Sequence, residues 1–218
     1  GKDPDKVLEM CRAYLRGSRQ SNVLSCVKHF PGDGVEERDQ HLVLGINDLS
    51  CEEWDASFGK VYQGLIDDGV ESIMAGHIAL PAYSRKFHPE YTDADIRPAT
   101  LAPELIQGLL RDKMGFNGIV VTDASHMGGM LSAGPRSMQV PGAIAAGCDM
   151  FLFFHDPEED FRYMMDGYKN GIITEERLNE ALMRILGMKA KLGLHKKRMM
   201  DTLDEKHLLG CAEHREIA

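Results

Sequence analysis

Two segments of this sequence carry side chains that could do nucleophilic or acid–base chemistry. In the first, an apolar run leads into the segment 28–34 (KHFPGDG), and Asp39 and His41 follow a few residues later. In the second, the apolar run 118–122 leads directly into Asp123. Polar groups at the carboxyl ends of successive strands are typical of barrel and open α/β enzymes. The pattern therefore predicts an enzyme whose site lies at the strand ends.

Asp123 stands where an apolar strand meets its loop. A carboxylate at such a place is desolvated on one side and open on the other, which suits a nucleophile or a general base. The alternative is an aspartate that caps the following helix or turn, with Ser125 as a competing cap. Position alone leaves both interpretations open.

The pair Asp39 and His41 has the composition of an acid–base dyad. A carboxylate two residues from an imidazole can orient the ring and raise its basicity. The alternative is a pair of polar residues in a solvated loop, which is the more common case because loops are polar in general. The spacing becomes informative only together with the other strand-end residues.

Lys28 and His29 lie at the end of the first predicted strand, and His77 lies near the end of the second, Glu71–Ile78. An unpaired buried charge is very costly, so Lys28, His29 or both should reach a polar ligand at the strand ends. A salt bridge from Lys28 to a neighbouring strand end is the alternative. Alone, His77 is best interpreted as a structural histidine. Three consecutive strands that each end in a titratable group favour a shared site.

Glycines accompany both segments. Gly32 and Gly34 flank Asp33 but match neither the dinucleotide-binding nor the P-loop pattern. We interpret them as backbone freedom for the loop that carries His41, and we give the pair Gly128–Gly129 the same interpretation after Asp123.

The bulk composition excludes several classes of protein. With 218 residues, 43% of them hydrophobic, the chain is long enough for one large α/β domain. A net charge of -9 argues against nucleic acid or an anionic membrane as a partner. The five cysteines are scattered and never spaced as CxxC, so neither a disulfide framework nor a zinc site is predicted. No leader and no membrane-length apolar run is recognisable, and a cytoplasmic location is expected.

Strand-like and helix-like segments alternate along the chain, which predicts parallel strands with right-handed crossovers. The apolar runs 119–121 and 151–154 predict strands that are buried on both faces. We expect strands at 23–30, 71–78, 118–122 and 150–154, and helices at 6–16, 50–68, 102–114, 141–146, 157–170 and 174–192, with a long loop at 79–100.

Taken together, these motifs resemble the catalytic domain of family 3 glycoside hydrolases. The features that match, in order, are the segment 28–34, the Asp-x-His pair, and the strand that ends in Thr-Asp. Within the family, the pattern is most similar to the bacterial β-N-acetylglucosaminidases, which use a histidine as acid/base. The resemblance runs from about residue 3 to residue 194. It implies that the four strands are the second half of a (β/α)8 barrel, in a domain of residues 1–194, with a peripheral helix or tail at 195–218.

The resemblance also implies roles for individual residues. Asp123 is similar to the nucleophile of a retaining, exo-acting enzyme, and His41 with its partner Asp39 is similar to the acid/base. Lys28, His29 and His77 are similar to residues that bind the sugar. No cofactor is implied, and cell wall recycling is the expected context. Because a neutral imidazole does not repel phosphate, a phosphorylase that uses the same covalent intermediate is an alternative.

The sequence departs from the family pattern in three places. Gln40 occupies the position inside the dyad where the family usually has a small hydroxyl residue. The loop 79–100 carries a segment of its own, 87–91 (FHPEY), that could reshape the site. The first half of the family barrel has no counterpart, so we expect a homo-oligomer or a partner that supplies it.

Two alternatives to an active glycosidase follow. One is a non-catalytic half-barrel, which keeps the motif but lacks a complete sugar site. The other is a metal-dependent hydrolase that uses His29, His77, Asp123 and His126. Against the metal site, no His-x-His pair lies on a predicted strand.

Overall fold

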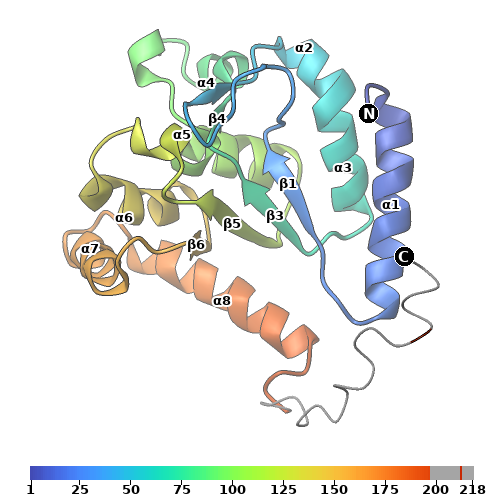
Figure 1. Ribbon diagram of the computed structural model, residues 1–218. Coiled ribbons are helices and arrows are strands. Elements are labelled where there is room, and N and C mark those ends of the chain that lie inside the picture. The colour runs from blue at the N-terminus through green and yellow to red at the C-terminus, as the bar shows by residue number, and fades with distance from the viewer. Residues whose placement is uncertain (197–211, 213–218) are drawn as a thin grey trace.

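The computed structural model describes residues 1–196 and residue 212, and its centre is one sheet of parallel strands. The strand order is β1-β3-β5-β6, and every neighbouring pair is parallel. The bounds are Cys26–Phe30 for β1, Ser72–Ala75 for β3, Ile119–Ala124 for β5 and Met150–Leu152 for β6. Helices alternate with these strands (Figure 1). The predicted α/β fold of four parallel strands is thereby confirmed, and it is the arrangement of half of a (β/α)8 barrel.

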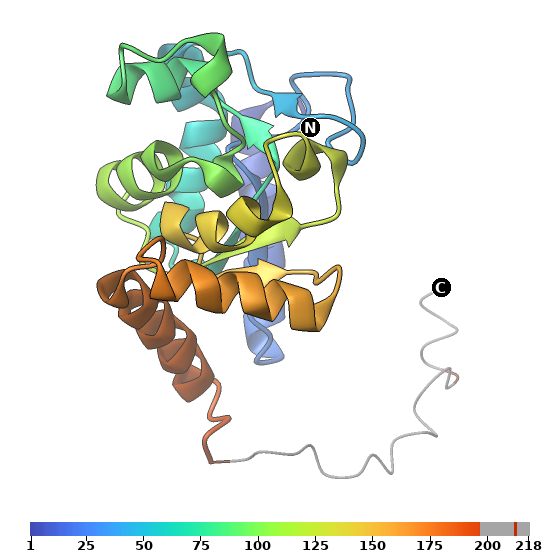
Figure 2. The same cartoon turned by 90° about the vertical axis from the view of Figure 1, so that its left-hand side faces the viewer.

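The long helices lie where the alternating pattern predicts them, and side chains cap several of them. Asp3 accepts from the first backbone N–H groups of α1, and Ser50 and Glu53 form the predicted capping box. The helices at the β1 edge are α1 (Pro4–Gln20), α2 (Cys51–Trp54) and α3 (Lys60–Asp67), the last two joined by a wide turn at Asp55–Gly59. The helices that follow are a π-type helix (Glu104–Lys113), α5 (Gly128–Leu131), α6 (Arg136–Ala146), α7 (Pro157–Lys169) and α8 (Glu175–Lys191). Figure 1 and Figure 2 show α1 and α3 side by side, and α7 and α8 at the other end of the sheet.

In the part of the chain that the structure describes, helices cover one face of the sheet and leave the other open. Ile73 and Val120 are register partners on the covered face, and both are fully buried. Met74, Val121 and Met150 are register partners on the other face; the first two are partly exposed and Met150 is 41% exposed. The prediction of strands buried on both faces is therefore wrong for Val121, and also for the run 151–154, whose side chains are all partly or largely exposed. In a half-barrel the inner face has no opposing strands to cover it.

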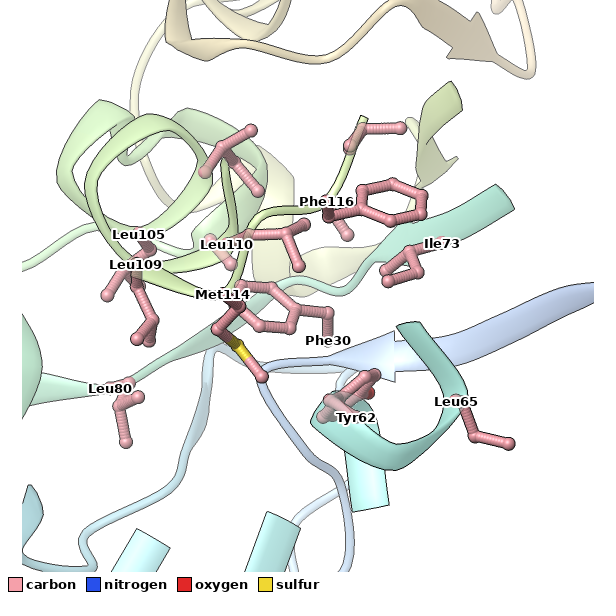
Figure 3. Close-up of a cluster of buried hydrophobic side chains, with 14 of the residues drawn as sticks. Phe30, Tyr62, Leu65, Ile73, Leu80, Leu105, Leu109, Leu110, Met114 and Phe116 are labelled. Atoms are coloured by element: carbon pink, nitrogen blue, oxygen red, sulfur yellow. The ribbon is translucent and has the colours of Figure 1, made fainter. Parts of the chain in front are cut away.

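The core lies between the covered face and the helices. Figure 3 shows side chains of the helix Glu104–Lys113 gathered with Phe30, Ile73 and Tyr62. Phe30 makes edge-to-face contacts with Tyr62 and with Trp54, at centroid distances of 5.2 and 6.2 Å. This packing fixes the carboxyl end of β1, from which the segment 28–34 leaves the sheet.

A buried carboxylate ties the start of β6 to its surroundings. Asp149 is fully buried and accepts from Arg111 at 2.8 Å and from Arg184 at 3.4 Å, and it also pairs with Arg177. Its Oδ2 accepts the backbone N–H of Val120 at 2.9 Å. The cluster therefore holds together β5, β6, α8 and the helix Glu104–Lys113.

Two predicted segments differ from the structure in kind. The expected loop 79–100 contains β4 (Ile78–Ala79), which pairs with β2 (Gly45–Ile46), the helix α4 (Pro81–Phe87) and two short turns of 3-10 helix. Proline at the first helical position and a fully buried Tyr83 explain α4. The predicted strand 150–154 stops at Leu152, and Phe153 and Phe154 are exposed.

Other differences concern lengths. β1 and β3 are shorter than predicted, and α6 begins at Arg136 rather than at 141, with Pro141 inside it. The predicted tail 195–218 lies almost entirely outside the described residues. Among the described residues, none of the helices is long and apolar enough to cross a membrane.

Candidate active site

Asp123 lies at the carboxyl end of β5, between β3 and β6. Its side chain is 13% exposed. Oδ1 accepts the backbone N–H of Ala124 at 2.7 Å, while Oδ2 lies 3.6 Å from Nε2 of His29. The backbone therefore fixes one carboxylate oxygen, and the other faces a neighbouring side chain. Such a fixed carboxylate is suited to attack in one direction.

Hydrogen bonds to β6 hold the backbone on both sides of Asp123. The hydroxyl of Thr122 accepts the N–H of Leu152 at 2.8 Å, and the N–H of Ser125 donates to the carbonyl of Leu152 at 2.9 Å. Arg136 donates to the Ser125 hydroxyl at 2.9 Å and pairs with Asp160. Ser125 is thus a buried structural residue, and the N-cap of the next helix, α5, is Met127 rather than Asp123 or Ser125.

His29 lies between two carboxylates at the end of β1. Its Nε2 faces Asp123, and its Nδ1 lies 3.7 Å from Oδ2 of Asp33. Burial lowers the pKa of His29, and this outweighs the opposite effect of Asp123. A Cβ on Gly76 would come within 3.0 Å of the His29 Cβ, so the glycine allows the ring to approach β3. Lys28 is exposed at the same strand end.

Asp39 and His41 are in direct contact. Nδ1 of His41 lies 2.6 Å from Oδ1 of Asp39, and the same oxygen accepts the backbone N–H of His41 at 2.9 Å. Both hydrogen bonds lower the pKa of Asp39, and the bond from the backbone N–H has the larger effect. The ring therefore directs Nδ1–H at the carboxylate and leaves Nε2 available to exchange a proton. The His41 side chain is 68% exposed, and among the described residues no ion pair joins it to Asp123.

The loop that carries the dyad rests on the backbone that follows Asp123. The N–H of Gly128 donates to the carbonyl of His41 at 2.8 Å, and that of Gly129 donates to the carbonyl of Gln40 at 3.0 Å. A Cβ on Gly128 would lie 2.2 Å from the Leu42 carbonyl oxygen. The two predicted catalytic segments are thus joined directly.

The expected reason for these glycines is partly wrong. Gly32 and Gly34 have φ values of 132° and 99°, a region that favours glycine, as predicted. Gly128 and Gly129 are not among the glycines with positive φ. They are needed because another backbone approaches closely, as the short Cβ distances show.

His77 is fully buried behind Asp123. Its Nε2 donates to the carbonyl of Ala124 at 2.9 Å, and its Nδ1 lies 3.0 Å from the hydroxyl of Thr100. Because a carbonyl only accepts, the proton sits on Nε2 and the lone pair of Nδ1 faces Thr100. Both ring nitrogens are therefore engaged by the protein. The structure places His77 against the backbone next to Asp123 rather than on an open surface.

The burial of His77 should make the stability of the fold depend on pH. Burial lowers its folded-state pKa below the unfolded value of about 6.5, so the unfolded chain binds the proton more tightly. The contribution of His77 to the free energy of unfolding is therefore present above about pH 6.5. It is lost as the pH falls, by at most about 1.4 kcal/mol per pH unit. Urea unfolding of wild type and His77→Gln between about pH 7.5 and 5.5 measures this slope.

The unfolding free energy should change less with pH in His77→Gln than in the wild type. Glutamine keeps an amide donor for the Ala124 carbonyl but does not titrate, and the contribution of His29 is common to both proteins. Equal slopes would contradict a buried, neutral His77.

Four contributors to this site were not predicted as such. Asp33 and Gln40 share a side-chain hydrogen bond, Gly76 admits the His29 ring, and Thr100 faces His77. Gln40 was noted only as a departure from a pattern. Gly76 and Thr100 carry no local sequence signal, because their contacts join residues far apart in the chain. Asp33 lies inside the segment 28–34 and its partners are near in the sequence, but its contacts were not predicted.

The side chains proposed for a metal site do not converge. No group of three or more His, Cys, Asp or Glu side chains in the described part of the chain is arranged to hold a metal ion. His126 is exposed, and both ring nitrogens of His77 are engaged by the protein.

Comparison with known proteins identifies the lineage of this arrangement. Residues 1–188 match the family described as "Glycosyl hydrolase family 3 N terminal domain". A "Beta-N-acetylglucosaminidase/beta-glucosidase" of Cellulomonas fimi is 49% identical over 222 residues, which is 100% of this chain and 39% of that protein. A "Beta-hexosaminidase" of Chromobacterium violaceum is 30% identical over 158 residues, 72% of this chain and 41% of that protein.

Solved structures agree with these relatives. "Beta-glucoside phosphorylase BglX bound to 2FGlc" superposes with a TM-score of 0.94 and 43% identity, over 98% of this chain and 38% of that one. A family 3 β-N-acetylglucosaminidase from Paenibacillus sp. str. FPU-7 gives a TM-score of 0.80 and 29% identity, over 93% of this chain and 37% of that one. The chain thus spans about two fifths of the length of each of these proteins.

Proposed function

Because this chain belongs to glycosyl hydrolase family 3, we propose that it carries the nucleophile and the acid/base of a retaining β-glycosidase. The substrate that we propose is a β-linked N-acetylglucosaminide, cleaved one terminal sugar at a time. The observation that carries the proposal is the direct contact between the two motifs. The Asp39–His41 pair rests by hydrogen bonds on Gly128 and Gly129, directly after the strand end that presents Asp123.

In the first step, Oδ2 of Asp123 attacks the anomeric carbon of the sugar. The bond to the leaving oxygen breaks, and that oxygen takes the proton from Nε2 of His41. Asp39 stabilises the protonated imidazole before the transfer through its contact with Nδ1. The product of this step is a glycosyl ester of Asp123, with His41 neutral.

In the second step, the neutral His41 takes a proton from water at Nε2. The oxygen of that water attacks the anomeric carbon from the face that the first leaving group occupied, and the carboxylate of Asp123 departs. Two inversions give net retention. Enzyme, dyad and proton count return to their starting state.

We propose that Lys28 and His29 bind sugar hydroxyls at the end of β1. The exposed ammonium of Lys28 and the half-buried ring of His29, 3.6 Å from the nucleophile, support this. For His77 we propose a supporting role, since its ring nitrogens bond to Ala124 and Thr100. It would act on the sugar through the backbone beside Asp123.

We propose that further strands complete the site, because the sheet of the described residues is open at both edges. β1 and β6 are the outer strands of the four-stranded sheet. Beside β6 lies an apolar groove of about 840 Å³, lined by side chains of α7 and α8 as well as Met150 and Phe154. We propose that a preceding half-barrel or a second copy of this chain covers these edges, since exposed edges and apolar grooves mark interfaces.

Sedimentation of the chain alone separates these occupants. Self-association would support a second copy as the covering partner. A monomer would instead favour the preceding half-barrel as that partner. A folded monomer that never binds sugar, even with the half-barrel of a relative fused in front of residue 1, would favour the non-catalytic interpretation.

A phosphorylase is the second candidate. The phosphorylase structure with a TM-score of 0.94 supports it, and a neutral imidazole does not repel phosphate as a carboxylate would. In this case phosphate would replace water in the second step, and the product would be a glycosyl phosphate.

The experiment that tests the proposal is turnover of aryl β-N-acetylglucosaminide and aryl β-glucoside, with and without phosphate. The chain is assayed alone and with the half-barrel that completes it. We expect release of the aryl group in the completed barrel and free sugar as the product without phosphate. A product that forms only with phosphate would assign the phosphorylase, and no release from either glycoside would contradict both.

The setting of the activity is part of the proposal. Free thiols at Cys11, Cys26, Cys51 and Cys148 are typical of a reducing compartment, which supports a cytoplasmic protein. A β-N-acetylglucosaminidase there would serve cell wall recycling. Accumulation of N-acetylglucosaminides in cells that lack the gene is the expected result, and unchanged levels would contradict it.

A further inference from the structure

Gln40 lies between the two members of the dyad, but its side chain points into the protein. It is 5% exposed. Its Oε1 accepts the backbone N–H of His77 at 3.0 Å, and its Nε2 donates to Oδ2 of Asp33 at 3.1 Å. The amide is therefore bonded at both ends, to the end of β3 on one side and to the loop after β1 on the other.

The same residue joins the dyad loop to the segment after the proposed nucleophile. The Gln40 carbonyl accepts the N–H of Gly129, and the neighbouring carbonyl of His41 accepts that of Gly128. Within the loop, the N–H groups of Leu42 and Val43 donate to the Asp39 carbonyl. Side chain and backbone of Gln40 thus contact the segments that follow three strands, β1, β3 and β5.

Gln40 also connects to the proposed nucleophile through side chains. The Asp33 oxygen that accepts its amide is the one that lies 3.7 Å from Nδ1 of His29. The other ring nitrogen of His29 lies 3.6 Å from Asp123. The Asp33 side chain is 48% exposed, and among the described residues the Gln40 amide is its hydrogen-bond donor.

We propose that Gln40 is a positioning residue that docks the loop 39–43 onto the strand ends and holds Asp33 against His29. The importance of the docking for catalysis rests on the proposed roles of His41 and Asp123. The docking itself can be measured without substrate, so its failure and that of the proposed function are distinguishable.

The dyad loop needs a support that fixes its position relative to Asp123. The dyad side chains are exposed, and nothing in their mutual contact fixes them relative to Asp123. A misplacement of about 1 Å can cost a factor of about 10² in rate. Loop residues that carry catalytic groups therefore need a rigid support, and a buried amide with both ends bonded supplies one.

Amide hydrogen exchange of Gly128 and Gly129 tests the docking. In Gln40→Met, which has similar length but no amide, exchange at these positions should rise by about tenfold or more. The matched control is Gln139→Met, another buried glutamine, which bonds to the carbonyls of Met130 and Gly134. It should leave exchange at Gly128 and Gly129 within about twofold of wild type. Equal effects of the two substitutions would overturn the proposal.

The pKa of His29, measured by NMR titration of its ring, tests the second contact. The charged groups that face this ring are Asp123, Lys28, Asp33 and His41. If Gln40→Met releases Asp33 into water, the ring loses a neighbouring negative charge and its pKa falls below the wild-type value. Gln139→Met should leave it unchanged. An unchanged His29 pKa in Gln40→Met would show that Gln40 does not hold Asp33.

A second variant covers the case in which Gln40→Met does not fold. Gln40→Glu keeps the shape and the acceptor for the His77 N–H but faces Asp33 with a carboxyl. When that carboxyl is protonated it can donate to Asp33, and when it ionises the two repel. Protection of Gly128 and Gly129 should therefore fall as pH rises in this variant and not in wild type. A pH-independent, wild-type protection would contradict the docking role.

Discussion

The Asp123→Asn variant should lose turnover of the aryl glycoside by a factor of more than about 10⁴. Asparagine keeps the size of the side chain and the acceptor for the Ala124 N–H, which the carboxylate holds at 2.7 Å. It removes the negative charge that would form the ester bond. The loss should appear in kcat and in kcat/KM alike, because the missing group acts in the transition state. Steady-state kinetics of the completed barrel measure it.

The matched control is Asp166→Asn, on the exposed side of α7, which should retain wild-type turnover. A sharper test uses Asp123→Ala with azide. The small anion can enter the space left by the side chain and attack the anomeric carbon from that side, giving a glycosyl azide of inverted configuration. Wild-type turnover by Asp123→Asn, or an azide product of retained configuration, would remove Asp123 from its proposed role.

The Asp149→Asn variant should lose about 3–5 kcal/mol of unfolding free energy. The carboxylate is fully buried and pairs with Arg111, Arg177 and Arg184. Its neutralisation leaves buried guanidinium groups without a counter-charge. The NH₂ group of asparagine would also point at arginine N–H groups, so that two donors meet without an acceptor. Urea unfolding of the chain at neutral pH measures the change.

Asp68→Asn is the control for this prediction. Asp68 also pairs with an arginine, Arg12, at 2.6 Å, but both side chains are substantially exposed. Water solvates the groups in either state, so the change in stability should be small by comparison. Equal losses in the two variants would contradict the role of Asp149 as the buried centre of its cluster.

The sequence predicts well where the strands lie and which candidate residues stand at their ends, because both depend on local patterns. An apolar run that ends on a titratable residue marks the carboxyl end of a strand, and this placed Asp123 and His29 where β5 and β1 end. The contact between Asp39 and His41 follows from their spacing in one loop.

Errors arose where long-range contacts decide the structure. The segment 79–100 has a loop-like composition, yet α4 forms there because Tyr83 packs in the core beside Trp54 and bonds to Asp55. Phe153 and Phe154 continue an apolar run, but β6 ends before them, and nothing in their composition distinguishes them from strand residues. An apolar run cannot show whether a covering layer is present.

The connections within the site were equally hidden. Gln40 reaches the backbone of His77, 37 residues away along the chain, and no periodicity reports such a bond. Gly128 and Gly129 were recognised as special, but the reason is the approach of residues 40–42 rather than an unusual φ. Sequence patterns identify the groups that could react, whereas the tertiary structure shows how they are held together.

The central claim, a covalent glycosyl ester on Asp123, is tested most directly by trapping it. A 2-deoxy-2-fluoro glycoside with a good leaving group slows both steps, because fluorine destabilises positive charge at the anomeric carbon. The good leaving group restores the first step, so the ester accumulates. Peptide mass spectrometry of the completed barrel should then find the sugar on the peptide that contains Asp123, with wild-type His41 present. A sugar on any other residue, or rapid turnover of the natural type of substrate with no trapped ester, would contradict the account.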